Sequence, residues 1–304
     1  MSGNLIRRCT HAGSWYTDNA VNLEQEVKDY MLKAKKDPVS NFEGKENVMA
    51  FITPHAGLMY SGPTAGYSYN CIDVYKKRKI FILGPLHEGG SKELYLSKAT
   101  HWETPIGNLA VDIKSTFYAE LESTGKFHRL GLKSDENEHS LELQTPFLAT
   151  LFKDRIDVTI IPIIISCISA SNLEIFGEIF KKYMADESCI FAISSDFCHW
   201  GERFGYQFYD NSQGQIFKSI ENMDMMGMNI IKTLNPDAFI KYLEDSKNTI
   251  CGREAITLMM KIISILNIDN SWKIHFLKYQ QSSQVTNFDD SSVSYISAVV
   301  VNDD

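Results

Sequence analysis

The sequence predicts an α/β fold with a central mixed β-sheet flanked by helices. Two observations lead to this prediction. Short apolar runs rich in β-branched residues alternate with longer segments of helical periodicity. Three of these runs are followed within a few residues by a histidine, and the ends of strands in an open α/β sheet are where ligands and catalytic groups collect. A metal site built from sequence-distant imidazoles at one sheet edge is therefore the first hypothesis.

Five apolar runs are expected to form strands, because each is rich in β-branched or aromatic residues and bounded by turn residues. They cover residues 48–53, 79–84, 158–165, 189–195 and 293–301. Pro162, inside a run that is apolar on both faces, predicts a bulge or an unpaired position. Helices are expected over residues 22–36, 141–152, 172–184, 213–220, 237–243 and 254–265. No repeat or linker interrupts this pattern, so residues 1–304 are expected to form a single domain.

The composition is that of an ordinary globular protein, with 44% hydrophobic and 22% charged residues. The net charge of -8 argues against broad attraction to nucleic acid or anionic membrane. No apolar run approaches the ~18 residues of a membrane span. The six cysteines include no CxxC pair and are expected to be free thiols. Because the first residues also lack a signal peptide, a cytoplasmic location is expected, and a nuclear one is compatible.

Two strand-end histidines occur in loops of the same design. His55 follows its run in a Pro-His-Ala-Gly loop, and His87 follows the next in a Gly-Pro-Leu-His loop. Neutral imidazole is a common ligand for zinc, copper and iron. Either histidine alone could merely hydrogen-bond its own loop, but the pair favours a metal site. Tyr60 lies just beyond the first loop and Glu88 directly follows His87, so both are candidates for the pocket wall.

The third strand-end histidine belongs to the segment Ser-Ser-Asp-Phe-Cys-His-Trp. Asp196 and His199 are three residues apart, so a helical turn would place them on one face. The carboxylate could ligate a metal, orient an imidazole, act as a base or simply cap the next segment. Cys251 lies just before the expected helix at 254–265, where the helix N-terminus favours a thiolate. That position suits a metal ligand or a nucleophile, and packing is the alternative.

Two further segments could line the same pocket. His139 and Glu142 lie in a Glu-His-Ser-Leu-Glu segment that is expected to open a helix, although a solvated acidic loop is an equal alternative. His11 and Trp15 place a polar group beside aromatic residues near the N-terminus. The glycine-rich nucleotide loops and the GxSxG nucleophile elbow are absent from the sequence, so neither chemistry has support.

Eight motifs follow one another over almost the whole chain: HAGSWY at 11–16, PHAG at 54–57, GPLH at 84–87, ETPIG at 103–107, EHSLE at 138–142, SSDFCHWG at 194–201, NTICGR at 248–253 and SSQ…DSSVSY at 282–295. These motifs resemble those of the Memo family, most closely its eukaryotic members. The resemblance implies an α/β fold similar to class III non-haem iron extradiol dioxygenases.

The resemblance also implies roles for particular residues. His55, His87 and Cys251 would be the metal ligands, and Asp196 and His199 would belong to the same pocket as a catalytic pair. It further implies binding of reduced iron or copper, intracellular redox control, and cell-motility signalling through receptor phosphotyrosine peptides. Because a cysteine stands where the dioxygenases have a carboxylate ligand, ordinary ring cleavage is not expected.

One motif departs from the family pattern, which more often reads GPSH followed by another histidine. Here Leu86 removes a hydroxyl and Glu88 adds a carboxylate, so the hydrogen bonding and charge around His87 are expected to differ.

Three functions remain open from the sequence. The first is a redox protein that binds iron(II) or reduced copper, with O₂ or a small molecule as a further ligand. The second is a metal-dependent oxygenase or a zinc hydrolase in which Asp196 is the general base, with a metal-free Cys251–His nucleophile as a variant. The third is a non-catalytic module for a phosphotyrosine peptide or signalling protein, for which Arg253 is the one candidate cation. Two imidazoles and a thiolate suit copper, iron or zinc, so the ligand set does not choose among them.

Overall fold

The computed structural model describes residues 4–37, 42, 44–90, 93–267 and 269–303. Within these residues the chain builds a nine-stranded mixed sheet. Its order is β10 (His199–Trp200), β12 (Ser292–Asn302), β2 (Val48–Thr53), β9 (Cys189–Ser194), β3 (Lys79–Pro85), β8 (Thr159–Ile165), β4 (Leu94–Leu96) and β7 (Phe127–Arg129), while β11 (Trp272–Gln281) pairs along β12. A separate small sheet contains β1 (Ile6–Arg7), β5 (His101–Trp102) and β6 (Leu109–Ala110).

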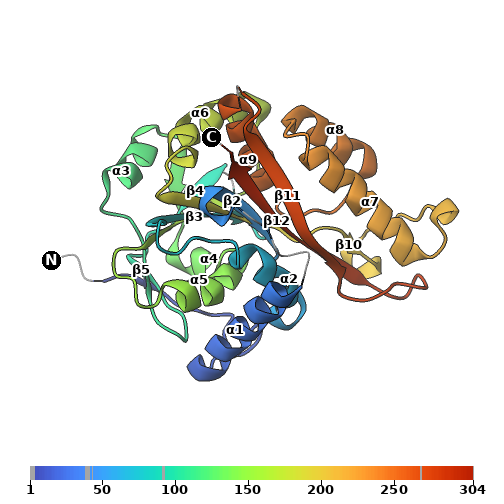
Figure 1. Ribbon diagram of the computed structural model, residues 1–304, viewed down its shortest axis with the longest axis horizontal. Coiled ribbons are helices and arrows are strands. Elements are labelled where there is room, and N and C mark those ends of the chain that lie inside the picture. The colour runs from blue at the N-terminus through green and yellow to red at the C-terminus, as the bar shows by residue number, and fades with distance from the viewer. Residues whose placement is uncertain (1–3, 38–41, 43, 91–92, 268, 304) are drawn as a thin grey trace.

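Helices cover both faces of the large sheet (Figure 1). One face carries α1 (Ala20–Lys36), α2 (Leu58–Tyr69) and α5 (Thr145–Phe152), and the other carries α6 (Ala170–Met184) and α9 (Arg253–Leu266). The remaining helices are α3 (Thr116–Ser123), α4 (Leu132–Asn137), α7 (Ile216–Ile231) and α8 (Pro236–Ser246). The predicted α/β class with a central mixed sheet flanked by helices is confirmed.

The five predicted strands are all present, because their apolar residues form the core of the sheet. Strands β2, β9, β3 and β8 are parallel neighbours and are buried along almost their whole length. The bulge predicted at Pro162 is wrong, since β8 pairs with β3 without a register shift. The alternative of an unpaired position holds only on the side facing β4, which pairs with Ile163 to Ile165, because on the other side Pro162 is in register with Ile82 of β3. Proline, which has no N–H to donate, therefore stands just beyond the last residue of the antiparallel strand β4.

Some predicted helices have different bounds. The helix expected at 141–152 is divided into a 3₁₀ turn, Glu142–Gln144, and α5. The helix expected at 213–220 begins three residues later, after a 3₁₀ turn and Gly214, and continues to Ile231. The helical turn considered for Asp196 and His199 does not form, because Phe197 and Cys198 are bonded through their backbones to Ser294 of β12 and His199 begins β10.

The parallel strands bring their carboxyl ends to one edge. Thr53 of β2 is in register with Ser194 of β9, and Leu83 of β3 is in register with Ile193. The loops that follow these strands contain His55, His87 and Asp196, so all three emerge together, as expected for an open α/β sheet.

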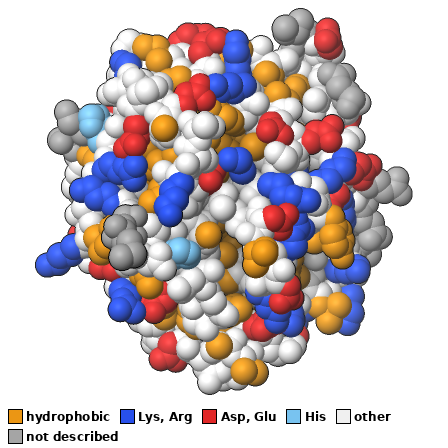
Figure 2. Space-filling model, turned by 90° about the vertical axis from the view of Figure 1, so that its left-hand side faces the viewer, with side chains coloured by type: hydrophobic (Ala, Val, Ile, Leu, Met, Phe, Trp, Pro, Cys, Tyr) orange, Lys and Arg blue, Asp and Glu red, His pale blue; other side chains and the backbone are white. Residues whose placement is uncertain are grey.

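The surface charge and the helix lengths can be compared with the expectations about nucleic acid and membranes. On the face shown in Figure 2, acidic and basic side chains are interspersed, so this face offers no large field of one sign. Among the residues that the structure describes, no helix has the length and apolar character needed to cross a membrane.

Candidate metal-binding site

His55 is the most buried imidazole of the site, with 1% of its surface exposed. Its Nδ1 lies 2.8 Å from the Ser194 hydroxyl, which donates its own proton to the Ser140 carbonyl at 2.7 Å. A hydroxyl has only one proton, so Ser194 must accept from Nδ1–H of His55. Burial and, after it, the charge of His87 lower the pKa of His55 well below its ordinary value. His55 is therefore a neutral imidazole whose Nε2 has a free lone pair.

Cys251 stands directly opposite that lone pair. Its Sγ lies 3.2 Å from His55 Nε2 and accepts a hydrogen bond from the backbone N–H of Asp196 at 3.2 Å. Burial and the charge of Asp196 raise the pKa of the thiol, so they outweigh the stabilisation of a thiolate expected at the start of α9. Without a metal, the thiol donates its proton to His55 Nε2. A metal ion would replace that proton, as it does whenever a cysteine becomes a ligand.

Gly252 allows Cys251 to approach the sheet. A Cβ at this position would lie 2.4 Å from Ser195 Cβ and 2.5 Å from the Ser194 carbonyl oxygen. Both neighbours belong to the end of β9 or its loop, so any larger residue would push the thiol away from His55.

His87 is held by a carboxylate that sequence reasoning missed. Glu138 accepts from His87 Nδ1 at 2.9 Å and from the His87 backbone N–H at 2.6 Å. Burial works to raise the pKa of Glu138, but the hydrogen bond and charge of His87 lower it below its ordinary value. A carboxylate bonded to Nδ1–H leaves Nε2 free, which is the usual arrangement around a metal-bound histidine. The only signal in the sequence was that Glu138 directly precedes His139.

His199 and Asp196 occupy the side of the pocket near β10. His199 Nδ1 lies 2.9 Å from the Phe197 carbonyl oxygen and 3.1 Å from that of Thr249, so it must carry the proton. The Asp196 carboxylate accepts from the backbone N–H groups of His55 and Ala56 at 2.8 and 3.3 Å. Burial raises the pKa of Asp196, and the charge of His199 opposes that effect. The buried Asp196 and the half-buried His199 are thus a charge-coupled pair able to hold or pass a proton.

The outer wall of the site is aromatic. The ring of His139 lies between Trp15 and His87, with centroid distances of 4.3 Å to each. A cavity of about 370 Å³ opens beside these rings, and its lining includes His11 and Glu88. The segment at 138–142 is therefore not the solvated acidic loop considered above, because Glu138, Ser140 and Glu142 are buried.

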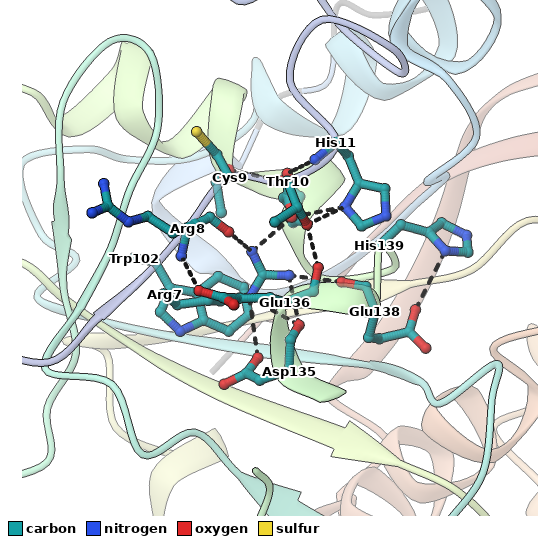
Figure 3. A network of polar contacts seen from close by, with 12 residues as sticks. Arg7, Arg8, Cys9, Thr10, His11, Trp102, Asp135, Glu136, Glu138 and His139 are labelled. Carbon is teal, nitrogen blue, oxygen red and sulfur yellow. Dashed lines mark hydrogen bonds and ion pairs between the residues drawn. The ribbon is translucent and has the colours of Figure 1, made fainter. Parts of the chain in front are cut away.

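A buried ion network supports this wall (Figure 3). Arg7 is fully buried and donates to Asp135 Oδ1 at 3.1 Å, to Glu142 Oε2 at 2.6 Å and to the Glu138 carbonyl oxygen at 2.7 Å. Glu142 in turn accepts from His11 Nδ1 at 2.9 Å. Burial tends to raise the pKa of Glu142, but His11 and Arg7 lower it. The network thus fixes the backbone of the segment that bears His139.

Two predicted pocket residues, Tyr60 and Arg253, make no hydrogen bond or ring contact with the described imidazoles. Tyr60, on α2, is 51% exposed. Arg253 lines a different cavity of about 340 Å³ together with Lys247 and Glu254, and none of the histidines lines that cavity.

The donor atoms fall into two groups, each with all its atoms within 4.8 Å of one another. One group is His55, His87 and His139, and the other is His55, Asp196 and Cys251. The predicted ligands His55, His87 and Cys251 are thus distributed over both groups, with His55 common to them. Two ligands at tetrahedral angles, at 2.0–2.1 Å for nitrogen and 2.3 Å for sulfur, would be about 3.5 Å apart. The 3.2 Å between His55 Nε2 and Cys251 Sγ is close to this value, so the residues fit a transition-metal ion.

The fold and the site define an α/β protein with a buried imidazole–thiol pocket at the carboxyl ends of its parallel strands. The profile of a family described as Memo-like protein matches residues 7–299, and the chain belongs to the Memo family. It is 42% identical over 298 residues to human Protein MEMO1, covering 97% of each chain. It is 41% identical over 299 residues to Protein MEMO1 of Xenopus tropicalis, covering 98% of each. It is 38% identical over 301 residues to the Protein memo-1 homolog of Caenorhabditis elegans, covering 98% of this chain and 83% of the relative.

Proposed function

We propose that this chain binds one reduced transition-metal ion, iron(II) or copper(I), through His55, His87 and Cys251, and that it acts in intracellular redox control. The observation that supports the proposal is the unprotonated Nε2 of His55, which lies 3.2 Å from the Sγ of Cys251 in a buried pocket. A soft thiolate beside neutral imidazoles favours copper(I), iron or zinc over hard cations. The free thiols of the chain agree with a reducing compartment such as the cytoplasm or nucleus.

The protein's own residues would have distinct tasks around the ion. Ser194 and Glu138 hold the Nδ1–H tautomers of His55 and His87, which keeps both Nε2 atoms available. A bound ion would supply electron transfer or Lewis-acid chemistry to O₂ or a small molecule in the neighbouring cavity. Asp196 and His199 would hold or move a proton in this pocket, since the buried Asp196 carboxylate lies within 4.8 Å of the His55 and Cys251 donor atoms and the half-buried His199 acts on its charge.

Metal analysis of protein purified anaerobically under reducing conditions tests the proposal. The wild type and a Cys167→Ser control, which changes an exposed thiol, should retain one ion per chain. His55→Ala and Cys251→Ser should each lose most of it. Equal metal content in the wild type and in both site variants would refute the assignment. Metal-free protein from an aerobic preparation would not decide the matter, because oxidation of Cys251 also removes a ligand.

A zinc hydrolase is the second candidate, favoured by the Asp196 carboxylate beside the same donor atoms. Zinc-loaded protein should then hydrolyse an ester, amide or phosphoester substrate, and Asp196→Asn should abolish that activity. A phosphotyrosine-peptide function rests on the family resemblance. If it uses Arg253, peptide affinity should fall in Arg253→Ala, and an unchanged affinity would remove that residue from the proposal.

A further inference from the structure

His139 differs from the other four imidazoles of the pocket in how it is held. His11, His55, His87 and His199 each have Nδ1 within 2.9 Å of a hydrogen-bonding oxygen. The nearest polar contact of the His139 ring is Nδ1 to Glu138 Oε1 at 3.6 Å, too long for a hydrogen bond. Among the described residues no other polar atom bonds to this ring. The His139 ring is therefore held by ring-stacking contacts and by no hydrogen bond.

The faces of His139 are occupied on both sides. Its ring is stacked on His87 with an interplanar angle of 20° and lies against Trp15 at 33°. Stacking resists tilting of the ring but allows it to rotate and slide in its own plane. No hydrogen bond has to break for that movement, so a ring nitrogen of His139 can turn toward an ion at little cost.

The donor atoms of His139 are already close to those of two proposed ligands. They lie within 4.8 Å of the donors of His55 and His87, and this group does not contain Cys251. Because Nδ1 of His55 is engaged by Ser194, His55 has only Nε2 to offer, and one lone pair can bind one ion. The imidazole group and the thiol group therefore compete for His55 and cannot be filled at the same time.

We infer that His139 is an alternative metal ligand, which gives the pocket a second, all-imidazole mode made of His55, His87 and His139. This inference rests on the proposed metal-binding function and extends it. The mode with Cys251 suits a soft ion such as copper(I), whereas three imidazoles suit a borderline divalent ion such as zinc(II), cobalt(II) or copper(II). The pocket thus retains a divalent ion when the thiol is unable to bind, and it holds one ion in either mode.

Anaerobic titration with cobalt(II), followed by absorption spectroscopy, tests the inference. Four proteins are compared: the wild type, Cys251→Ser, His139→Phe and the double variant. Phenylalanine preserves the stack on His87 and Trp15 while removing both nitrogens, so thermal melting should be nearly unchanged. We expect Cys251→Ser to bind one equivalent of cobalt(II) without thiolate charge-transfer absorption. The double variant should bind cobalt(II) more weakly than Cys251→Ser, by on the order of 10- to 100-fold or more. Loss of a residue that only hydrogen-bonds to a metal ligand already has an effect of that size.

A parallel titration with copper(I) against a competing chelator provides the opposite control. His139→Phe should leave copper(I) affinity unchanged, and Cys251→Ser should weaken it strongly. The inference is overturned if the double variant binds cobalt(II) as well as Cys251→Ser does, if Cys251→Ser alone abolishes cobalt(II) binding, or if the wild type binds two equivalents. Wild-type protein that binds neither ion would instead refute the proposed metal-binding function, and the inference with it.

Discussion

Replacing Arg7 by methionine should greatly destabilise the protein. Methionine approximates the length of the arginine stem, so the change mainly removes the charge and the six donated hydrogen bonds, which end at five oxygen atoms. Those bonds end at Glu142 Oε2, at Oδ1 and the carbonyl oxygen of Asp135, and at the carbonyl oxygens of Glu138 and Arg8. Both carboxylates have fully buried side chains and would be left without their cation. Breaking a buried ion pair from one side costs about 3–5 kcal/mol.

Denaturant unfolding followed by tryptophan fluorescence measures this effect as a change in the free energy of unfolding. The neighbouring Arg8→Met is the matched control, because the Arg8 side chain is 66% exposed and its ion pair with Glu103 should contribute about 0–1 kcal/mol. A loss below about 1 kcal/mol for Arg7→Met, or equal losses for the two variants, would refute the reasoning. Adding Asp135→Asn and Glu142→Gln to Arg7→Met should restore part of the stability, since no unpaired buried charge then remains.

The same network sets a pH dependence. In the wild type the pKa of Glu142 is lower in the folded state than its ordinary 4.5, so the associated stability is present above pH 4.5 and is lost as the pH falls. Burial raises the pKa of Glu142 and the charge of Arg7 lowers it, so the folded-state pKa of Glu142 should rise when Arg7 is removed. The stability difference between wild type and Arg7→Met should therefore shrink on acidification, and a difference that grows would contradict this assignment.

Three other predictions concern separate parts of the site and its surroundings. Glu138→Gln should weaken metal binding by about 10- to 100-fold because it removes the carboxylate behind His87, whereas Glu136→Gln, measured by the same titration, should have little effect. Burial raises the pKa of Asp224 from 3.8 to about 6. This shift corresponds to about 3 kcal/mol, so in urea unfolding the stability of the wild type relative to Asp224→Asn should fall by about that amount between about pH 3 and pH 7.5. A difference that does not change with pH would show that the carboxyl titrates normally. Gly252→Ala should cost about 1–3 kcal/mol and lower metal affinity because its Cβ would overlap Ser195, while Gly131→Ala, whose Cβ meets nothing within 4 Å, should be tolerated in thermal melting and metal titration.

The sequence was sufficient for the parts of the fold that depend on local pattern. Long buried strands such as β2 and β8 were predictable because apolar runs bounded by turns have few alternatives. The two- and three-residue strands, including β10, were not, since their extended form is imposed by a neighbour rather than by their own residues. The same reason explains why the helical turn considered around Asp196 does not form.

The candidate site could be predicted in its position but not in its hydrogen bonding. The strand-end loops place His55 and His87 at one edge, and that much follows from parallel pairing. The partner of His87 is Glu138, 51 positions away, and the partner of His55 is Ser194, 139 positions away. Such pairings depend on how separate loops meet in space, so no spacing rule reveals them. For the same reason, the looser placement of His139 was visible only in three dimensions.

Strand β12 lies inside the sheet although it is the last strand of the described chain. It pairs with β2, whose residues precede it by about 250 positions, and it also holds β10 and β11. During synthesis, the edge of β2 that faces β12 stays unpaired until the chain has been made as far as β12. The loop that contains Asp196 and His199 also cannot reach its final conformation before then, because its backbone is bonded to Ser294 of β12. Assembly of the pocket is therefore a late event in folding, and truncations that remove β12 should yield chains prone to edge-to-edge association.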